Sequence, residues 1–343
     1  MLEEVYSGKT VLVTGATGFK GSWLCIWLLK LGAKVIGFSS VDWDNTFVFD
    51  KANLKDKIID IRGDVRDFAQ VKEVVYKYKP VIVFHLAAQP LVRTSYDKPL
   101  ETLSTNILGT LNVLECIMIY DFLKAGVMIT TDKVYKNKEK EEGYSEDDEL
   151  GGFDPYSSSK ACAEIIINSY RCSFNQQCKQ IASVRAGNVV GGGDYSKDRL
   201  ISDCIKAIEK DEEIRVRAPH STRPWQHVIE PLYGYLIVGE RLLRGALVGT
   251  SFNFGPNIEN VVPVKEVVSK IGPWVDVSDS KDKKHETVKL ALNIKKAKSI
   301  LGWEPKWGID KTIKKTVEWY KRSKNEDVYN LCIEQIEEYE NEQ

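Results

Sequence analysis

Tyr156 and Lys160 are the two residues of this sequence with the clearest potential for redox chemistry. They lie four positions apart, so on a helix they occupy the same face. A lysine ammonium close to a phenol favours the phenolate and lowers its pKa from about 10 toward working pH. Such a tyrosine can take the proton from a hydroxyl group while a hydride leaves the same carbon. This spacing also occurs by chance in many sequences, so its meaning depends on its context.

A glycine-rich segment near the N-terminus provides that context. Residues 14–21 read TGATGFKG and join a β-branched apolar run, Thr10–Thr14, to a helical pattern. Glycines at such a turn allow the backbone to approach a pyrophosphate, and the free N–H groups of the helix N-terminus bind its charge. Glycines that serve only the turn are the alternative. The position of the segment between a strand and a helix favours a dinucleotide site.

Contacts with the cofactor are expected at this loop and at the ends of the strands that follow it. Ser39 stands at the end of the second strand, where a carboxylate commonly binds the ribose, and no neighbour in sequence is an arginine suited to a 2′-phosphate. The sequence therefore favours NAD over NADP. The predicted cofactor-binding residues are Gly15, Thr17, Gly18, Phe19, Gly21, Ser39, Asp64, Val65, Leu86, Ala87, Gln89, Tyr156 and Lys160.

Strands and helices alternate through the first half of the chain. Six apolar runs of strand length are separated by helical patterns, and continuous apolar runs are typical of parallel strands buried on both faces. The predicted strands are Thr10–Thr14, Lys34–Phe38, Ile59–Val65, Val81–Ala87, Val127–Thr131 and Ile181–Val190. The predicted helices include Ala69–Tyr78, Pro99–Tyr120 and one that begins at Asp154 and Pro155. The predicted fold class is α/β, with a doubly wound parallel sheet of the Rossmann type.

The pattern changes after about Gly191 to shorter helices, proline-containing loops and a charged tail. Residues 1–190 are predicted to form the cofactor-binding domain, with a return segment near residues 226–255. Residues 191–343 are predicted to form a smaller, mixed α/β substrate domain.

The composition is that of an ordinary soluble globular protein. The chain has 343 residues, of which 48 are basic and 49 acidic, so its formal net charge is −1. This balance argues against nucleic acid as a partner, which needs a basic face. No uncharged run approaches the ~20 residues that span a bilayer. Seven cysteines without CxxC spacing and four scattered histidines form no disulfide or zinc pattern. We expect a cytoplasmic protein with reduced thiols, no metal and no membrane segment.

Five segments resemble the extended short-chain dehydrogenase/reductases that act on nucleotide sugars: TGATGFKG, HLAAQ, TTDKVY, YSSSK and RAGNVVGGGD. The match runs essentially from end to end. Leu150–Lys160, Arg223–Pro231 and His285-Glu286 before a late LGWEP resemble, more narrowly, the CDP-glucose branch of the nucleotide-sugar 4,6-dehydratases. The resemblance implies an NAD cofactor, a nucleotide-sugar substrate and a homodimer or homotetramer formed through the helices near residues 99–120 and 156. It also implies a place in deoxysugar biosynthesis for surface polysaccharide such as the lipopolysaccharide O-antigen.

The same resemblance implies the reaction and three further catalytic residues. C4 of the hexose is oxidised, water is eliminated across C5–C6, and the hydride returns to C6. Thr131 would hydrogen-bond the C4 oxygen beside Tyr156, Asp132 would protonate the departing C6 hydroxyl, and Lys133 would remove the C5 proton. These roles need a protonated aspartic acid and a neutral lysine, and burial favours both because it disfavours either charged form. A solvated Asp–Lys pair at a strand end is the alternative. Lys133 is typical of the CDP-glucose branch, whereas Thr131 and Val134 depart from its usual Ser and Cys.

The second half of the chain supplies most of the candidate substrate contacts. The predicted substrate-binding residues are Gln89, Asn188, Arg199, Arg223 and His227. Asn188 resembles the family's diphosphate-contacting asparagine, and the arginine forks suit a diphosphate. Three other functions stay open at this point: a nucleotide-sugar 4-epimerase, a 4,6-dehydratase of a dTDP-, GDP- or heptose-linked sugar, and a catalytically silent dinucleotide sensor.

Overall fold

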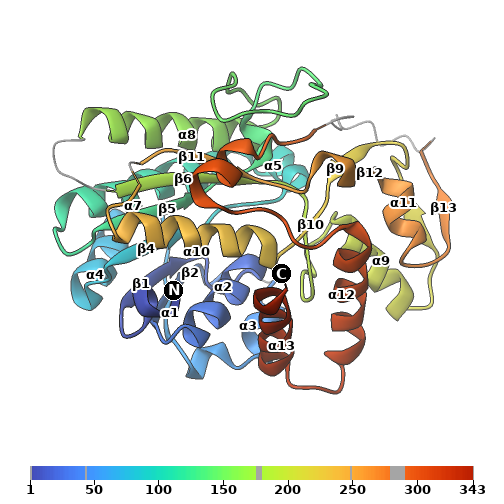
Figure 1. Ribbon diagram of the computed structural model, residues 1–343, viewed down its shortest axis with the longest axis horizontal. Helices are drawn as coiled ribbons and strands as arrows, with labels where there is room; N and C mark the ends of the chain where they lie inside the picture. The colour runs from blue at the N-terminus through green and yellow to red at the C-terminus, as the bar shows by residue number, and fades with distance from the viewer. Residues whose placement is uncertain (1, 43–44, 175–179, 248, 279–289, 343) are drawn as a thin grey trace.

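The computed structural model describes residues 2–42, 45–174, 180–247, 249–278 and 290–342. Its centre is a seven-stranded sheet of order β11-β6-β5-β4-β1-β2-β3, in which every neighbouring pair is parallel (Figure 1). The strands are β1 (Thr10–Thr14), β2 (Lys34–Ser39), β3 (Ile59–Arg62), β4 (Ile82–His85), β5 (Ala125–Ile129), β6 (Gln180–Ala186) and β11 (Ser251–Phe254). This order confirms the predicted doubly wound parallel sheet.

Helices cover both faces of the sheet. Val11 and Val13 of β1 belong to the same core cluster as Trp23 of α2, whereas Leu12 between them packs in the cluster of Val71 of α4. Because both faces are buried, an apolar side chain is favoured at every position of the strand. The helices around the sheet are α1 (Leu2–Tyr6), α2 (Phe19–Lys30), α3 (Phe47–Lys51), α4 (Phe68–Tyr78), α5 (Val92–Asp97), α6 (Pro99–Leu103), α7 (Gly109–Ile119), α8 (Pro155–Ser173) and α10 (Ile229–Leu243).

Two elements differ from their predicted form. The strand predicted over residues 181–190 is divided into β6 and β7 (Val189–Val190), because Asn188 adopts a φ of 43° that turns the chain out of the sheet. The helix predicted over residues 99–120 contains a π-helical segment between α6 and α7. The stretch Pro99–Ile119 is long and apolar enough to cross a membrane by length and composition alone, and it packs against α8 in the fold.

Elements that follow β7 in the sequence form a second region beside the sheet (Figure 1). They are α9 (Leu200–Glu209), β8 (Ile214–Val216), β9 (Thr222–Pro224), β10 (Gln226–His227), β12 (Val261–Pro263), α11 (Val264–Ser269), β13 (Trp274–Asp276), α12 (Ile309–Arg322) and α13 (Val328–Asn341). Within this stretch of sequence, α10 packs on β5 and β6, and β11 pairs with β6. The division into domains 1–190, with a return near 226–255, and 191–343 stays a prediction.

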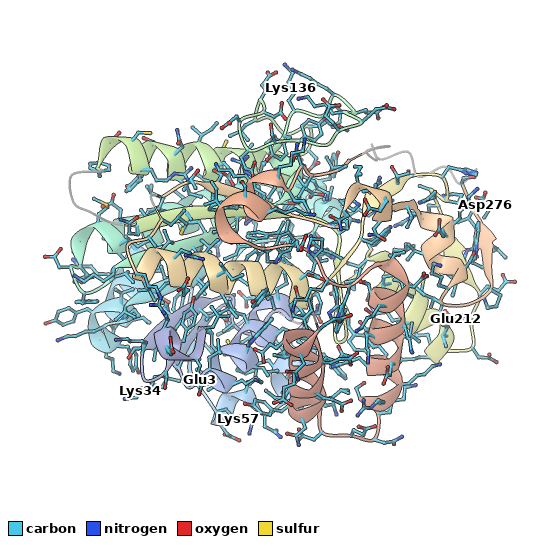
Figure 2. The ribbon with its side chains drawn as sticks, in the orientation of Figure 1. Glu3, Lys34, Lys57, Lys136, Glu212 and Asp276 are labelled. Atoms are coloured by element: carbon cyan, nitrogen blue, oxygen red, sulfur yellow. The ribbon has the colours of Figure 1, made fainter. Side chains whose placement is uncertain are left out.

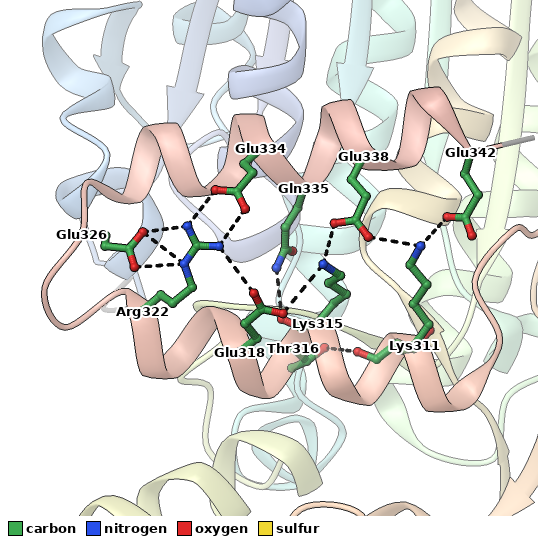
Figure 3. Close-up of polar contacts among 11 residues, drawn as sticks. Lys311, Lys315, Thr316, Glu318, Arg322, Glu326, Glu334, Gln335, Glu338 and Glu342 are labelled. Atoms are coloured by element: carbon green, nitrogen blue, oxygen red, sulfur yellow. Dashed lines mark hydrogen bonds and ion pairs between the residues drawn. The ribbon is translucent and has the colours of Figure 1, made fainter.

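The last two helices are joined by a row of ion pairs. Arg322 bridges Glu326 and Glu334, and Lys315 contacts Glu338 at 2.5 Å (Figure 3). Helix α13 also packs on α2, where Trp27 donates a hydrogen bond to a glutamate of α13 at 2.8 Å. Helix α13 therefore connects α12 of the second region to α2, which packs on the sheet. Other charged side chains, such as those labelled in Figure 2, lie at the periphery of the molecule.

The strand order places the functional residues at one edge. Strand β1 lies between β2 and β4, so the chain runs outward from it in opposite directions on its two sides. Ligands of open α/β sheets bind beyond the carboxyl ends of the strands at such a switch point. The segments that follow β1, β4, β5 and β6 share this edge.

Candidate active site

A cavity of about 790 Å³ opens at the carboxyl edge of the sheet. Its walls are the start of α2, the segment after β5, the first turn of α8 and the segment after β6, and residues of the second region close the opposite side. The predicted site residues that line it are Phe19, Thr131, Asp132, Lys133, Tyr156, Asn188, Arg199 and Arg223. The structure thus brings four of the five predicted catalytic side chains together with three of the candidate substrate contacts.

The segment after β5 begins a short helical turn, Asp132–Val134, which the Thr131 side chain caps. The hydroxyl of Thr131 donates to Asp132 Oδ1 at 2.9 Å, and Lys133 Nζ contacts the same oxygen at 3.1 Å. Asp132 is fully buried, and its Oδ2 has no hydrogen-bond partner among the described residues. A buried carboxylate with one free oxygen is costly unless a ligand or a proton satisfies it. The solvated pair considered from sequence therefore does not describe Asp132.

Tyr156 is buried at the start of α8, whose N-terminus is capped by Asp154. Burial raises the pKa of Tyr156 to about 12, although a hydrogen bond with Thr131 and the charge of Arg199 lower it. The direction is opposite to the one predicted from the Tyr–Lys spacing, because removing the phenol from water outweighs nearby positive charge. The phenolate therefore needs further positive charge in the loaded site.

Lys160 lies one turn below Tyr156 and does not itself line the cavity. Its Nζ donates to the backbone oxygen of Ile129 at 3.1 Å, at the end of β5. Burial lowers the pKa of Lys160 to about 8, and the negative charge of Glu164 opposes that shift. The residue is thus a buried cation tied to the strand that leads to Thr131.

The glycine loop has the shape of a dinucleotide cradle. Gly15 has a φ of +73°, and a Cβ there would lie 2.8 Å from the backbone nitrogen of Ala87. A Cβ on Gly21 would lie 2.0 Å from the oxygen of Gly15, so strand and helix approach too closely for any side chain. Gly18 begins α2 without a side-chain cap, which leaves N–H groups of the first turn available for a phosphate. These residues fit the predicted cofactor.

The strand ends beside the loop complete this cradle. Ser39 accepts a hydrogen bond from the Thr17 backbone at 3.2 Å, so it ties the end of β2 to the loop. Sequence reasoning missed Arg62, which is the register partner of Ser39 across β2 and β3 and contacts Asp60 at 3.0 Å. Only the strand pairing reveals that neighbour, because the two residues are far apart in the sequence.

The remaining cofactor candidates lie along the same edge. The Asp64 carboxylate contacts Arg66 at 2.5 Å, and this arginine holds its pKa below the ordinary value. Val65 is buried and Leu86 follows β4 directly. The amide of Ala87 donates to the side chain of Thr14. Their contacts with the cofactor stay predictions.

Two predicted substrate residues lie outside the cavity wall. Gln89 is buried, and its side-chain amide forms hydrogen bonds within the fold. It donates to Thr102 at 2.7 Å and accepts from the Leu91 backbone at 2.6 Å. His227 is fully buried between Trp23 and Trp307, at ring-centroid distances of 6.1 and 4.9 Å. Burial lowers its pKa to about 3. The Gln89 amide is satisfied within the fold, whereas His227 Nε2 has no hydrogen-bond partner among the described residues. Neither side chain lines the cavity, so their predicted contact with substrate has no support in this geometry.

The other substrate candidates face the cavity. Asn188 presents a buried Oδ1 that finds no partner within the described part of the chain, and its left-handed φ is well tolerated by asparagine. Arg199 lies 3.8 Å from Asp194, and Arg223 donates to the backbone of Thr222. The motif residues His285 and Glu286 lie outside the described residues.

Lys20 is a cavity residue that sequence reasoning missed. It follows Phe19 in the glycine loop, and burial together with the charges of Arg199 and Lys160 lowers its pKa to about 7. Its position inside the TGATGFKG segment was the available signal, since a cation in the first turn of that helix faces the site. Across the described ranges, no group of three His, Cys, Asp or Glu side chains is arranged to hold a metal ion.

Comparisons with known proteins agree with this geometry. Residues 12–316 match the model of the family described as GDP-mannose 4,6 dehydratase. The chain is 43% identical over 347 residues to a CDP-glucose 4,6-dehydratase of Salmonella typhimurium, with 97% of each chain covered. It is 26% identical to a UDP-glucose 4-epimerase of Mycolicibacterium smegmatis, over 90% of this chain and 98% of that one.

A solved structure shares the fold at lower identity. The dTDP-glucose 4,6-dehydratase of Bacillus anthracis, in complex with NAD, superposes with a TM-score of 0.77 at 23% identity, covering 95% of this chain and 100% of that chain. At this identity the likeness shows a shared Rossmann-type fold and no more. With a family model that spans most of the sequence and a relative at 43% identity over nearly all of it, this chain belongs to the nucleotide-sugar 4,6-dehydratase family of extended short-chain dehydrogenase/reductases.

Proposed function

We propose that this protein is an NAD-dependent enzyme that converts CDP-glucose to CDP-4-keto-6-deoxyglucose. The observation that carries the proposal is the contact between the buried Asp132 and the partly exposed Lys133, which lies beside Thr131 and faces the same cavity as Tyr156. An oxidation at C4 needs only a tyrosine and a hydride acceptor, whereas an elimination also needs an acid and a base. The 43% identity with a CDP-glucose 4,6-dehydratase supports the choice of nucleotide and sugar.

The first step is oxidation at C4. NAD, when bound, would supply the hydride acceptor for C4 and a positive ring charge that favours a phenolate. Tyr156 takes the proton of the C4 hydroxyl, and Thr131 holds the C4 oxygen beside it. Lys160 contributes positive charge from below, and the cofactor is held by Gly15, Gly18 and the first turn of α2.

The second step is loss of water. Transfer of one proton from Lys133 Nζ to the Asp132 carboxylate, across their 3.1 Å contact, produces the amine and the carboxylic acid that elimination requires. The Lys133 amine then removes the C5 proton, made acidic by the C4 ketone, while Asp132 protonates the C6 hydroxyl, which leaves as water. The two side chains thereby return to the ammonium and the carboxylate.

The last step completes the balance of protons. C6 accepts the hydride, and C5 receives a proton from Lys133, so the oxidation state of the cofactor is restored. Tyr156 has then gained the proton of the C4 hydroxyl and Asp132 has lost one to water. The Thr131 hydroxyl contacts both groups and offers a path by which Tyr156 returns that proton to Asp132.

The test is incubation of the purified protein and NAD with CDP-, dTDP-, UDP- and GDP-hexoses, with each product weighed by mass spectrometry. Loss of one water from CDP-glucose alone supports the proposal. Loss of water from one of the other nucleotide sugars supports the dehydratase reaction but assigns a different nucleotide to the substrate. Interconversion without a mass change indicates a 4-epimerase, for which the acid–base pair is not needed.

We further propose that the enzyme works in the cytoplasm as a homodimer or homotetramer, supplying a deoxysugar precursor of surface polysaccharide such as O-antigen. Support for assembly comes from the helices α6, α7 and α8, which expose large apolar side chains, including Leu100, Ile119 and Ile165. Helices with such faces gain stability by pairing with a second copy. Light scattering should give a molecular mass at least twice that of one chain. The Ile165→Asp variant should give a lower mass, because a charge on this face opposes pairing.

A further inference from the structure

Helix α8 carries another buried ionisable side chain one turn after Lys160. Glu164 is only 1% exposed and accepts three hydrogen bonds: from Thr130 Oγ1 at 2.5 Å, from Ser183 Oγ at 2.8 Å and from Arg185 at 2.7 Å. Although burial alone would raise the pKa of Glu164, the charge of Arg185 and these hydrogen bonds hold it below the ordinary value. A fixed negative charge therefore lies directly behind the end of β5.

Thr130 connects this charge to the catalytic residues. The residue before it, Ile129, offers the carbonyl that receives Lys160 Nζ at 3.1 Å. The residue after it, Thr131, donates to Asp132 at 2.9 Å and contacts Tyr156. The Thr130 side chain is itself buried. The Thr130–Glu164 contact thus ties the short segment that holds the predicted catalytic groups to α8, while the Thr130 N–H donates to the Val184 oxygen of β6 at 2.9 Å.

We propose that Glu164, acting through Thr130, is a positioning residue that sets the end of β5 against α8 and thereby places Lys160, Tyr156 and Thr131 for catalysis. This inference rests on the proposed function, because it assumes that those three side chains act on the sugar. Glu164 itself does not line the cavity.

Stability alone is a poor explanation for this arrangement. A buried ion pair such as Glu164–Arg185 is often replaceable by apolar side chains of similar volume without loss of stability. Here one carboxylate oxygen accepts from Arg185 and Ser183 and the other from Thr130, which directly follows β5. That division of contacts is what a residue that aligns two elements requires.

The charge of Glu164 also acts on Lys160. The other titratable groups that interact with Lys160 are Lys20 from α2 and His85 from β4, while Tyr156 lies one turn earlier on its own helix. Burial lowers the pKa of His85 to about 3, so it is uncharged at working pH. Glu164 is thus the negative charge that counters burial and the repulsion by Lys20.

Three variants of the full-length protein test the proposal. Thr130→Val removes the hydroxyl at nearly constant volume and leaves the Glu164–Arg185 pair intact. Thr130→Ser keeps the hydroxyl. Ser183→Ala is the matched control, because it removes an equally buried hydrogen bond to the same carboxylate without touching the strand end.

Turnover of CDP-glucose and backbone hydrogen exchange of the segment 126–136 are measured for each variant. We expect Thr130→Val to lower kcat by about tenfold or more with KM changed less than threefold, since small displacements of catalytic groups are costly. It should also speed exchange in the segment, whereas Thr130→Ser and Ser183→Ala should stay within threefold of the original kcat.

Equal losses in Thr130→Val and Ser183→Ala, or unchanged exchange in Thr130→Val, would overturn the positioning role. Exchange is measured without substrate, so it reports on the anchor even if the unaltered protein fails to act on CDP-glucose. If the Thr130→Val variant converts CDP-glucose at the normal rate, the positioning role of Glu164 is contradicted. The proposed function of the enzyme is unaffected by that result.

Discussion

Gly187 leaves the space that the Asp132 carboxylate occupies. A Cβ at position 187 would lie 1.9 Å from Asp132 Oδ2 and 2.2 Å from its Cγ. Gly187, which directly follows β6, therefore makes the burial of the proposed acid Asp132 possible. This contact joins two segments that are more than fifty positions apart in the sequence. Glycine is required at position 187 because a side chain would collide with Asp132, and its backbone conformation is not the reason.

Gly187→Ala should displace Asp132 and stop dehydration. We expect kcat to fall by about 100-fold, because the acid no longer lies within reach of the C6 hydroxyl. Gly272→Ala is the control, since a Cβ there meets no atom closer than 3.4 Å. Steady-state rates and thermal melting of both variants check the prediction. Full activity in Gly187→Ala would contradict the placement of Asp132.

The double variant Asp132→Asn, Lys133→Met should separate oxidation from elimination. Tyr156 and Lys160 remain, so C4 is still oxidised slowly, while the acid and the base for water loss are absent. We expect absorbance of NADH to appear in a single turnover, with water release slowed by a factor on the order of 10² to 10⁴. Normal dehydration by this variant would refute the assigned roles.

The alkaline limb of the pH–rate profile should depend on Glu164. Lys160 must be an ammonium to favour the Tyr156 phenolate, and its pKa of about 8 means that activity declines as pH rises through that value. Glu164→Gln removes the negative charge, lowers the pKa of Lys160 and moves the limb to lower pH. Glu164→Asp, which keeps the charge, should leave the limb close to its original position. A limb that is identical in all three proteins would exclude this electrostatic role.

His227 should make the fold sensitive to acid. Its pKa is about 3 in the fold and about 6.5 in an unfolded chain, so the unfolded state binds the extra proton between these values. The stabilising effect of the neutral ring is complete above pH 6.5 and decreases as pH falls toward 3. At pH 5 the loss from this residue amounts to about 2 kcal/mol in the free energy of unfolding.

The control for that prediction is an exposed histidine. The gap in melting temperature between the original protein and His227→Gln should narrow from pH 7.5 to pH 5, because the variant lacks the buried ring. His220→Gln alters an exposed side chain and should follow the original protein at both values. A constant gap would show that His227 is not held neutral by the core.

Local sequence signals predicted the sheet and several residues of the cavity wall. TGATGFKG and the Tyr156–Lys160 spacing depend on residues close together in the chain, and both occur where they were expected, at the carboxyl edge of a confirmed parallel sheet. The end of the sixth strand was wrong, because the turn at Asn188 is set by contacts with the second region.

Long-range packing decided what the sequence could not. His227 resembles a ligand contact in sequence, but Trp307, eighty positions later, covers its ring. Gln89 similarly turns to Thr102 rather than to the cavity. In the other direction, burial reversed the expected shift of the Tyr156 pKa, since spacing alone shows a nearby cation but not the loss of water around the phenol.

The most direct test of the central claim is the fate of the hydrogen at C4. CDP-glucose labelled with deuterium at C4 should be incubated with the purified protein and NAD, and the product examined by mass spectrometry and NMR. An internal oxidation, elimination and hydride return predicts loss of one water with the deuterium carried to the C6 methyl group. Deuterium that remains at C4, or a product that keeps the elements of water, would contradict a 4,6-dehydratase.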